Sequence, residues 1–353
     1  MEISPSNIVL VLEKPMQSRA LAPFAAERWP GRQVLVVYTF YLGLYEFRYP
    51  RGLSYADFPY VGEPTWKIRT FGDPKLPDPR PLRFVVELMN GQVNPTELNP
   101  FEVIAGAGEI WFGCDPDHSG ANGFDVLLSQ ILGDEEAAKE RQALILRSYT
   151  EAEISRTLYN PTTTADPRYR EWSNKGQAKR FFDYNYNVNS LALFGDCLRK
   201  VGVDTSDFGL SKYALQLLYW QRGKEPLSEG RIIRLMEDWV GTGRYKPCGI
   251  GSVASRSSIM MQLRRAGLTA YEDRLTLITD RGNDFLNLLH PDCEDPDLSA
   301  RLAAWQADWP NSKAAMARYL RTFFGKQARF KPARRSFFSV AADALPNSQT
   351  PKI

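Results

Sequence analysis

Short runs of apolar residues alternate with helical patterns over the first half of the chain. Residues 8–12, 33–40 and 82–88 are rich in Val, Leu and Phe and have the length of buried strands. Residues 16–29 carry apolar positions at helical spacing, with Pro23 as an irregularity. Strands that alternate with helices are typical of a mostly parallel α/β sheet. We therefore expect a Rossmann-like parallel sheet in this half.

The same alternation continues to about residue 158. Thr150 and Glu153 form a capping box that opens a helix. Residues 62–81, rich in proline and charge, are expected to form a loop. The other elements expected here are strands over 109–113 and 143–147 and helices over 123–132 and 150–158.

Strands become scarce after residue 158. Residues 254–289 read as a helix, a strand and a second helix, an order that resembles a winged helix, which can present a helix to nucleic acid. A helix pair in an ordinary core is the alternative, and both stay open. We predict three segments, namely a sheet domain over 1–158, a mainly helical region over 159–330 and a basic, flexible tail over 331–353.

Composition excludes wholesale disorder and a membrane span. Of 353 residues, 43% are hydrophobic and 24% are charged, which is the ordinary globular range. The longest uncharged apolar stretch, residues 34–45, is far shorter than the roughly 20 residues that cross a bilayer. Residues 1–7 have no basic start or apolar run, so we expect no export signal. A soluble, cytoplasmic protein without a membrane partner is predicted.

The net charge and the numbers of cysteines and histidines limit the kinds of site that the chain can form. The formal net charge of +3 does not by itself indicate a polyanionic partner. The 4 cysteines are scattered without a Cys-x-x-Cys pair, which favours reduced thiols over a zinc site. The 2 histidines, His118 and His290, limit any histidine-based acid–base scheme.

Three acids stand where a parallel sheet would bring them together. Glu13 directly follows the first expected strand, and Asp115 and Asp117 follow the strand over 109–113. Ligands of open α/β sheets bind beyond the carboxyl ends of the strands, so these carboxylates can share one crevice. Carboxylates suit Mg²⁺, which in turn binds a phosphodiester. The plainer alternatives are a first-turn helix carboxylate for Glu13 and a common turn for Asp-Pro-Asp.

Several motifs occur in the order found in type IA DNA topoisomerases. Val-Leu-Glu-Lys-Pro at 11–15 resembles the opening of their Toprim domain, particularly in the topoisomerase III branch. Cys-Asp-Pro-Asp-His-Ser-Gly at 114–120 stands where the family has its acidic Asp-x-Asp-x-Glu motif. Gly-Ile-Gly-Ser-Val-Ala-Ser-Arg at 249–256 is similar to the family's Gly-Ile-Gly-Thr-Pro-Ala-Thr-Arg element. Weaker similarities lie at 19–21, 48–66, 178–191 and 209–216.

The resemblance implies an α/β Toprim domain followed by a mainly α-helical, winged-helix-like core that binds single-stranded or branched DNA. It implies Mg²⁺ at Glu13, Asp115 and Asp117, with His118 as a neighbouring acid–base or phosphate-contacting group. The residues expected to contact DNA phosphates are Lys14, Arg180, Arg256, Arg264, Arg265 and Arg274. Each of these is alternatively a solvated surface charge. Aromatic residues beside Arg180 could stack on unpaired bases or belong to the core, namely Phe181, Phe182, Tyr184 and Tyr186.

The sequence also departs from the family. The family's nucleophilic tyrosine lies in a Thr-Tyr-Pro-Arg-Thr-like motif on a gate segment, and here only a short stretch separates Gln216 from Leu227. The nearest substitute, Tyr245, lies in a glycine-rich segment. Ser119 replaces the third acid of the acidic motif, and Phe-Tyr at 40–41 replaces a Gly-His pair.

Three functions follow from these departures. Strand passage needs a covalent phosphotyrosine and a moving gate, so we expect a DNA-binding protein that does not pass strands alone and that works in a complex with other proteins. A Mg²⁺-dependent Toprim nuclease, using the three acids and His118, is the first alternative. A non-enzymatic structural subunit is the second.

Overall fold

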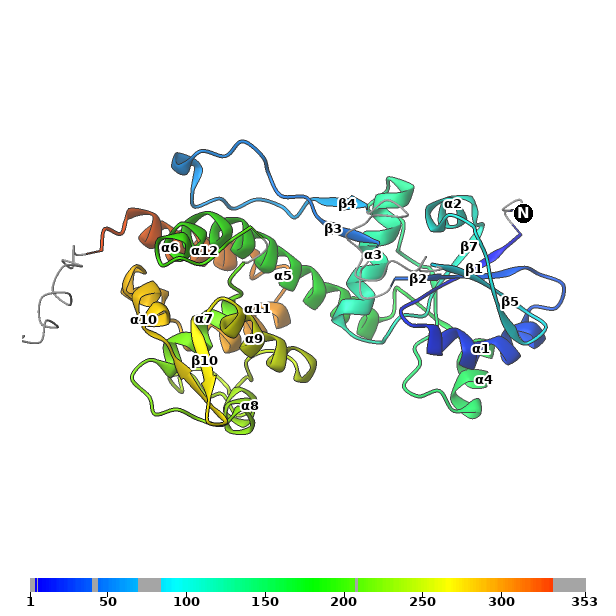
Figure 1. Cartoon of the computed structure of the whole chain (residues 1–353). Coiled ribbons are helices and arrows are strands. Elements are labelled where there is room, and N and C mark those ends of the chain that lie inside the picture. The colour runs from blue at the N-terminus through cyan, green and yellow to red at the C-terminus, as the bar shows by residue number, and fades with distance from the viewer. Residues whose placement is uncertain (1–3, 5, 40–43, 69–83, 207–208, 333–353) are drawn as a thin grey trace, which may run out of the picture.

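The structure, a computed structural model, describes residues 4, 6–39, 44–68, 84–206 and 209–332. The Phe-Tyr pair at 40–41 and the tail from residue 333 lie outside the described residues. Figure 1 shows a sheet region and a helical region, with helix α5 (Pro167–Asn189) running from one into the other. Within the described residues, no helix has the length and apolarity needed to cross a membrane.

The sheet region is built on a seven-stranded sheet with a parallel centre. Strand β1 (Ile8–Leu12) pairs in parallel with β2 (Val34–Tyr38) on one side and with β7 (Glu109–Phe112) on the other. All five residues of β1 are buried, as expected for a parallel strand covered on both faces. The order of strands is β6-β5-β2-β1-β7-β8-β9, in which the outer members are β5 (Val85–Met89), β6 (Gln92–Pro95), β8 (Gln142–Ala143) and β9 (Thr162–Thr163).

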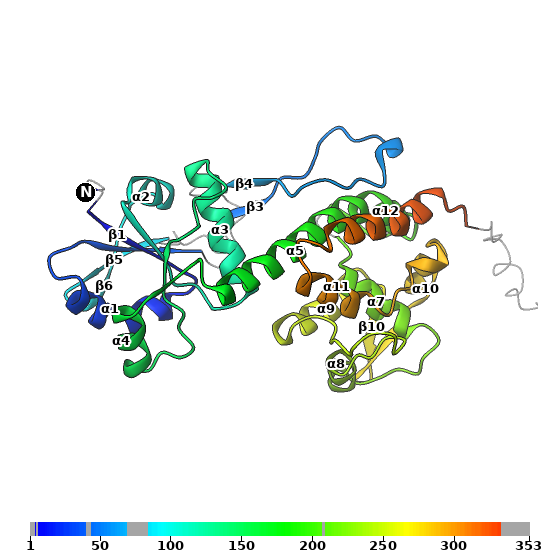
Figure 2. The same ribbon diagram turned by 180° about the vertical axis from the view of Figure 1, so that it is seen from behind.

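Helices cover both faces of this sheet. Alternate side chains of β1 belong to two separate cores. One core includes α1 (Pro15–Arg28) and α4 (Glu151–Tyr159), and the other includes α2 (Pro100–Gly106) and α3 (His118–Leu132). Figure 2 shows these two pairs on opposite sides of the strands. The predicted α/β sheet is therefore confirmed in its parallel centre, whereas β5, β6 and β9 add antiparallel pairs.

Two predicted boundaries were wrong. The strand predicted over 143–147 ends at Ala143, because its partner β7 ends at Phe112, and the N–H of Leu144 donates to the Phe112 carbonyl (2.7 Å). The helix predicted from residue 123 begins at His118, because the Asp117 carboxylate accepts the first free backbone N–H groups and caps it there. The capping box at Thr150 is confirmed in part, since its hydroxyl accepts from the N–H of Glu153.

An arm, residues 48–65, extends from a small sheet over the helical region (Figure 1). The small sheet pairs β3 (Tyr45–Phe47) with β4 (Trp66–Ile68), and a 3₁₀ turn, η1 (Tyr55–Asp57), lies within the arm. Backbone N–H groups of Tyr60 and Gly62 donate to Asn189 and Asn185 of α5, both at 2.8 Å. Of the loop predicted over 62–81, only residues 62–68 are described, and β4 is part of them.

The helical region packs around α5. Helix α12 (Lys313–Arg329) lies along α5 (Figures 1 and 2), and Phe182, Tyr186 and Phe324 are buried between them. A two-stranded hairpin of β10 (Thr269–Glu272) and β11 (Leu275–Ile278) follows α9 (Val253–Arg265). The strand predicted over 274–278 is therefore paired with one that was not predicted. The elements are η2 (Ser190–Phe194), α6 (Gly195–Lys200), α7 (Lys212–Gln221), α8 (Glu229–Glu237), α9 (Val253–Arg265), β10 (Thr269–Glu272), β11 (Leu275–Ile278), α10 (Asp280–Asn287), η3 (Pro291–Cys293), α11 (Leu298–Ala307) and α12 (Lys313–Arg329).

Candidate functional site

The carboxyl ends of β1 and β7 bring two of the predicted acids into contact. The strands run in register, with Val11 opposite Phe112, so the residues that follow them leave the sheet at the same edge. The backbone N–H of Asp115 donates to Oε2 of Glu13 (3.3 Å). Glu13 and Asp115 are far apart in sequence and become neighbours because the parallel strands β1 and β7 end at the same edge of the sheet.

A lysine and a glutamine complete this edge of the sheet. The Lys14 ammonium contacts Oδ2 of Asp115 at 2.5 Å. The Gln17 amide nitrogen donates to Oδ1 of Asp115 (3.1 Å) and to the Tyr149 hydroxyl (2.9 Å). The side-chain oxygen Oε1 of Gln17 accepts from the backbone N–H groups of Glu13 and Lys14, each at 2.7 Å. Sequence reasoning missed Gln17. The only indication of its role was its position four residues, about one helical turn, after Glu13.

Asp117 and His118 lie at the adjoining end of helix α3. Oδ1 of Asp117 accepts from the N–H groups of Ser119 (2.7 Å) and Gly120 (2.9 Å), which turns this carboxylate toward the helix. A Cβ at Gly120 would overlap the Asp115 carbonyl, so the tight turn requires glycine there. The described residues contain no cluster of three His, Cys, Asp or Glu groups arranged to hold a metal ion.

The electrostatics of this edge show a surplus of negative charge around Glu13. Burial raises the pKa of Glu13, and the charges of Asp115 and Asp117 raise it further. The Asp115 N–H and the Lys14 ammonium oppose that shift without cancelling it. A cation placed beside Glu13 and Asp115 would relieve the repulsion. Mg²⁺ commonly takes one or two carboxylates and completes its shell with water and phosphate oxygens. Both carboxylate oxygens of Asp115 have partners in this structure, Lys14 and Gln17.

Helix α5 brings cations beside this edge. Gly176 lies against α3 so closely that an added Cβ would overlap the His118 carbonyl and the Asn122 side chain. Burial lowers the pKa of His118, and the nearby charges of Lys179 and Arg180 lower it further, whereas Asp117 raises it. Arg180 is half-buried and has no ion-pair partner within the described part of the chain. His118 is therefore favoured as a neutral imidazole next to a cationic helix face.

A buried ion cluster anchors this stretch of α5. Asp183 pairs with Lys179 (2.6 Å) and with Lys212 of α7. Burial alone raises the pKa of Asp183, but the two ammonium groups outweigh burial and hold that pKa far below its usual range. The Lys212 side chain is only 8% exposed, so this pair is part of the core. From the sequence, only the Lys179–Asp183 pair could be expected, because these residues are one helical turn apart. Nothing local indicated Lys212.

The other predicted DNA contacts lie in the helical region, on α9 and its hairpin. Arg256 is 8% exposed and lies beside Glu237 (3.6 Å). Arg264 pairs with Glu229 and covers the Tyr271 ring at 4.5 Å. Arg265 and Arg274 are exposed, and Arg274 is at the β10–β11 turn with a φ of 65°. The structure thus pairs Lys14 with Asp115 and places Arg180 within electrostatic range of His118, whereas these four arginines lie on α9 and its hairpin.

The aromatic residues beside Arg180 are core residues. Phe181, Phe182, Tyr184 and Tyr186 are each at most 3% exposed, so none presents a free ring face to a base. Tyr245 is half-buried in its loop, and its hydroxyl accepts from Arg301 of α11 (3.4 Å). Of the two readings left open for the four aromatics, the structure supports the core.

Comparison with known proteins does not identify a family. No protein-family model matches the chain, and no curated protein matches it significantly. The resemblance to type IA topoisomerases therefore rests on the motifs and their order.

Proposed function

We propose that this protein is a topoisomerase III-like DNA-binding protein that engages single-stranded or branched DNA, without passing strands by itself, within a larger DNA-processing assembly. The observation that carries the proposal is the joint edge of the sheet region and α5. There Glu13 and Asp115 are in contact, Lys14 pairs with Asp115, and Arg180 lies in the same electrostatic neighbourhood through His118.

The chemistry of this edge suits a phosphodiester. Arg180 would contact phosphate oxygens and so position the strand without reading its sequence. Glu13 and Asp115 would hold Mg²⁺, which supplies positive charge to a phosphate when it is bound. His118, kept neutral by burial and neighbouring cations, would accept or donate a hydrogen bond at the same phosphate.

The helical region would extend the nucleic-acid surface. Helices α8 and α9 followed by the β10–β11 hairpin have the order of a winged helix, which we propose as their role. The exposed side chains of Arg265 and Arg274 lie at the end of α9 and on the hairpin turn, where a strand backbone would pass. Because the sequence has no Tyr-Pro-Arg-Thr motif, we propose that the protein forms no covalent phosphotyrosine intermediate.

Fluorescence anisotropy with labelled single-stranded, forked and duplex DNA tests this function. We expect salt-sensitive binding that prefers the single-stranded and forked probes. Arg180→Ala should reduce the slope of log affinity against log salt by about 0.7 on single-stranded DNA, the value for one lost phosphate contact. Arg321→Ala, which removes an exposed arginine of α12, is the matched control and should leave the slope unchanged. DNA relaxation by the purified chain, or no DNA binding at low salt, would contradict the proposal.

A Mg²⁺-dependent nuclease is the second candidate, favoured by the burial of Glu13 and the carboxylates around it, which together raise its pKa. Incubation of single-stranded and forked DNA with Mg²⁺ or Mn²⁺ tests it. Cleavage that Asp115→Asn abolishes would support the nuclease over the binding protein. Intact DNA with both metals would dismiss it, and a chain that neither cuts nor binds DNA would be the structural subunit.

A further inference from the structure

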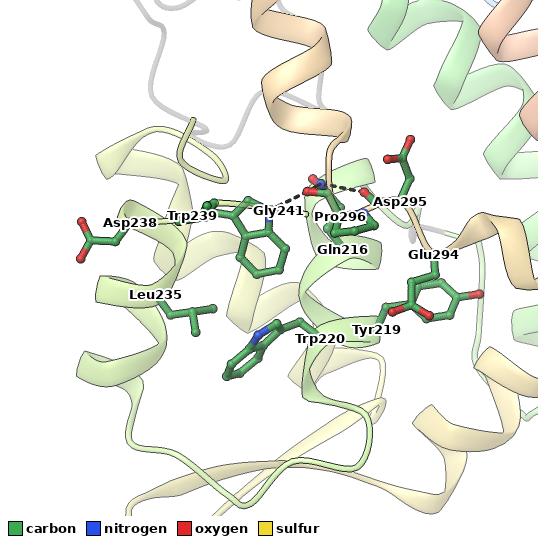
Figure 3. A pocket seen from close by; sticks show the side chains of 11 residues that line it. Gln216, Tyr219, Trp220, Leu235, Asp238, Trp239, Gly241, Glu294, Asp295 and Pro296 are labelled. Atoms are coloured by element: carbon green, nitrogen blue, oxygen red, sulfur yellow. Dashed lines mark hydrogen bonds between the residues drawn. The ribbon is translucent and has the colours of Figure 1, made fainter. Parts of the chain in front are cut away.

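A pocket of about 370 Å³ lies in the helical region, apart from the acids of the sheet edge. It is bounded by α7, by the end of α8 with the loop after it, and by residues 294–296. Figure 3 shows the indoles of Trp220 and Trp239 bordering one hollow, with Leu235 on one side and Gln216 and Tyr219 on the other. This volume is within the usual range of small-ligand sites.

The walls of this pocket are held in place by hydrogen bonds. The Trp239 N–H donates to the Pro296 carbonyl (2.7 Å), which fixes a ring that is only 7% exposed. The backbone N–H of Thr242 donates to Oδ1 of Asp297 (2.7 Å), and Gly241, with a φ of 62°, leaves no room there for a Cβ. The loop after α8 is thereby tied to the segment before α11. The hollow is preformed, so a ligand would not have to order it.

Every charged group that lines the pocket is acidic. Asp295 is paired with Arg301 (2.8 Å) and accepts a hydrogen bond from the Tyr319 hydroxyl (2.7 Å). Asp238 points outward, whereas Glu294 lies beside the Tyr219 ring (Figure 3). Glu294 is exposed and has no ion-pair partner among the residues that the structure describes. An uncompensated carboxylate in the wall of a pocket that also contains two indoles favours a cation and disfavours a phosphate.

One buried acceptor in this wall has no donor. Gln216 is 5% exposed, and its amide nitrogen donates to the Asp295 carbonyl (3.0 Å). That bond fixes which end of the amide is oxygen, because the opposite assignment would set two oxygens against each other. The Gln216 oxygen is buried without a hydrogen-bond partner among the described residues. A buried acceptor of this kind costs free energy, which a ligand N–H would recover once the Gln216 side chain turned its oxygen into the hollow.

We propose that this pocket binds an arginine side chain presented by a partner polypeptide. A guanidinium is flat enough to stack on an indole and carries several N–H donors, which match the Gln216 oxygen and the Glu294 carboxylate. A lysine ammonium is compact and strongly hydrated, so it gains less from the two rings. Val240, 52% exposed at the rim, gives the partner backbone an apolar surface to lie on. The proposal is independent of the DNA-binding function.

Isothermal titration calorimetry of the full chain with a short peptide tests this site. The probe is N-acetyl-Gly-Arg-Gly-amide, and its matched control carries citrulline, the neutral isostere of arginine. We expect saturable binding of the arginine peptide and binding at least about fivefold weaker for the citrulline and lysine peptides. Equal binding of the citrulline peptide, or no heat of binding with the arginine peptide at millimolar concentration, would overturn the proposal.

Variants of the pocket locate the binding. Trp220→Leu and Glu294→Gln should each weaken the arginine peptide by about threefold or more, because one removes a ring and the other a charge. Glu272→Gln removes an exposed carboxylate on β10, outside the pocket, and should leave affinity unchanged. Glu294→Gln changes an exposed side chain, so it tests the site even if Trp220→Leu unfolds. Unchanged peptide affinity in Glu294→Gln, or an equal loss of single-stranded DNA affinity in that variant, would refute the site.

Discussion

Two carboxylates of this protein, one buried and one largely enclosed, have opposite electrostatic surroundings. Glu13, at the carboxyl edge of the sheet, has a raised pKa because burial and neighbouring acids exceed the compensation it receives. Asp183, in the middle of α5, has a lowered pKa because Lys179 and Lys212 overcompensate its burial. The second arrangement is complete as it stands and stabilises the fold. The first has one ammonium, Lys14, among three carboxylates, so its negative charge is only partly compensated.

The largest effect on this comparison should come from Asp183→Asn. It leaves the buried Lys212 ammonium without its partner, and we expect the free energy of unfolding to fall by about 3–5 kcal/mol. Urea denaturation followed by circular dichroism measures this change. The control is Asp196→Asn on α6, where an exposed carboxylate pairs with Lys200, and it should cost less than about 1 kcal/mol. Equal losses in the two variants would contradict the structural role of Asp183.

The same carboxylate predicts an acid dependence. Because folding lowers the pKa of Asp183, its contribution to stability is complete above the unfolded value and is lost as pH falls through the folded one. The stability difference between wild type and Asp183→Asn should therefore shrink below about pH 4, the unfolded pKa of an aspartate. Urea denaturation repeated down to pH 2 measures it, and a difference that stays constant with pH would be the opposing result.

Gly176→Ala should have the next largest effect, because it separates the two regions being compared. The added methyl group has no room between α5 and α3, and we expect a loss of about 1–3 kcal/mol. Gly230→Ala on α8 is the matched control, since nothing lies within 4 Å of the added methyl group. Helix propensity predicts that this control is neutral or stabilising by up to about 1 kcal/mol. Thermal unfolding of both variants checks the pair.

A smaller and opposite effect is expected from Glu13→Gln. Removing the crowded charge should raise the free energy of unfolding at pH 7 by about 0.5–1 kcal/mol, as is common where function opposes stability. Because folding raises the pKa of Glu13, its charge costs stability as pH rises from the unfolded value through the folded one. The gain should disappear when the wild type is protonated, near pH 3. A destabilised variant at pH 7 would argue against a surplus of negative charge.

The smallest effect on DNA affinity is expected for an arginine that already has an ion-pair partner. Arg264 pairs with Glu229 and covers the Tyr271 ring, so Arg264→Ala should change single-stranded DNA affinity by less than about twofold. Arg180→Ala should exceed that change in the same anisotropy titration. The reverse ranking would move the nucleic-acid surface from α5 to α9.

The parallel centre of the sheet and the closeness of Glu13 and Asp115 could be predicted from the sequence. Apolar runs mark the buried strands, and the ends of those runs therefore locate the residues at the carboxyl edge of the sheet. Side-chain partners were less accessible. The sequence suggests a surface cation at Arg256, yet this residue is buried beside Glu237. Its burial depends on the position of a loop, which no local sequence pattern describes. The pocket lined by Trp220 and Trp239 joins a residue of α7 to one in the loop after α8, so no local sequence pattern indicates it.

The central claim is that Glu13 and Asp115 form a cation-dependent phosphate site. Titration of single-stranded DNA in matched ionic strength, with and without Mg²⁺, tests it most directly. We predict that Mg²⁺ raises the affinity of the wild type by about fivefold or more and does not raise that of Glu13→Gln. An affinity that Mg²⁺ leaves unchanged, or raises equally in both proteins, would contradict the claim.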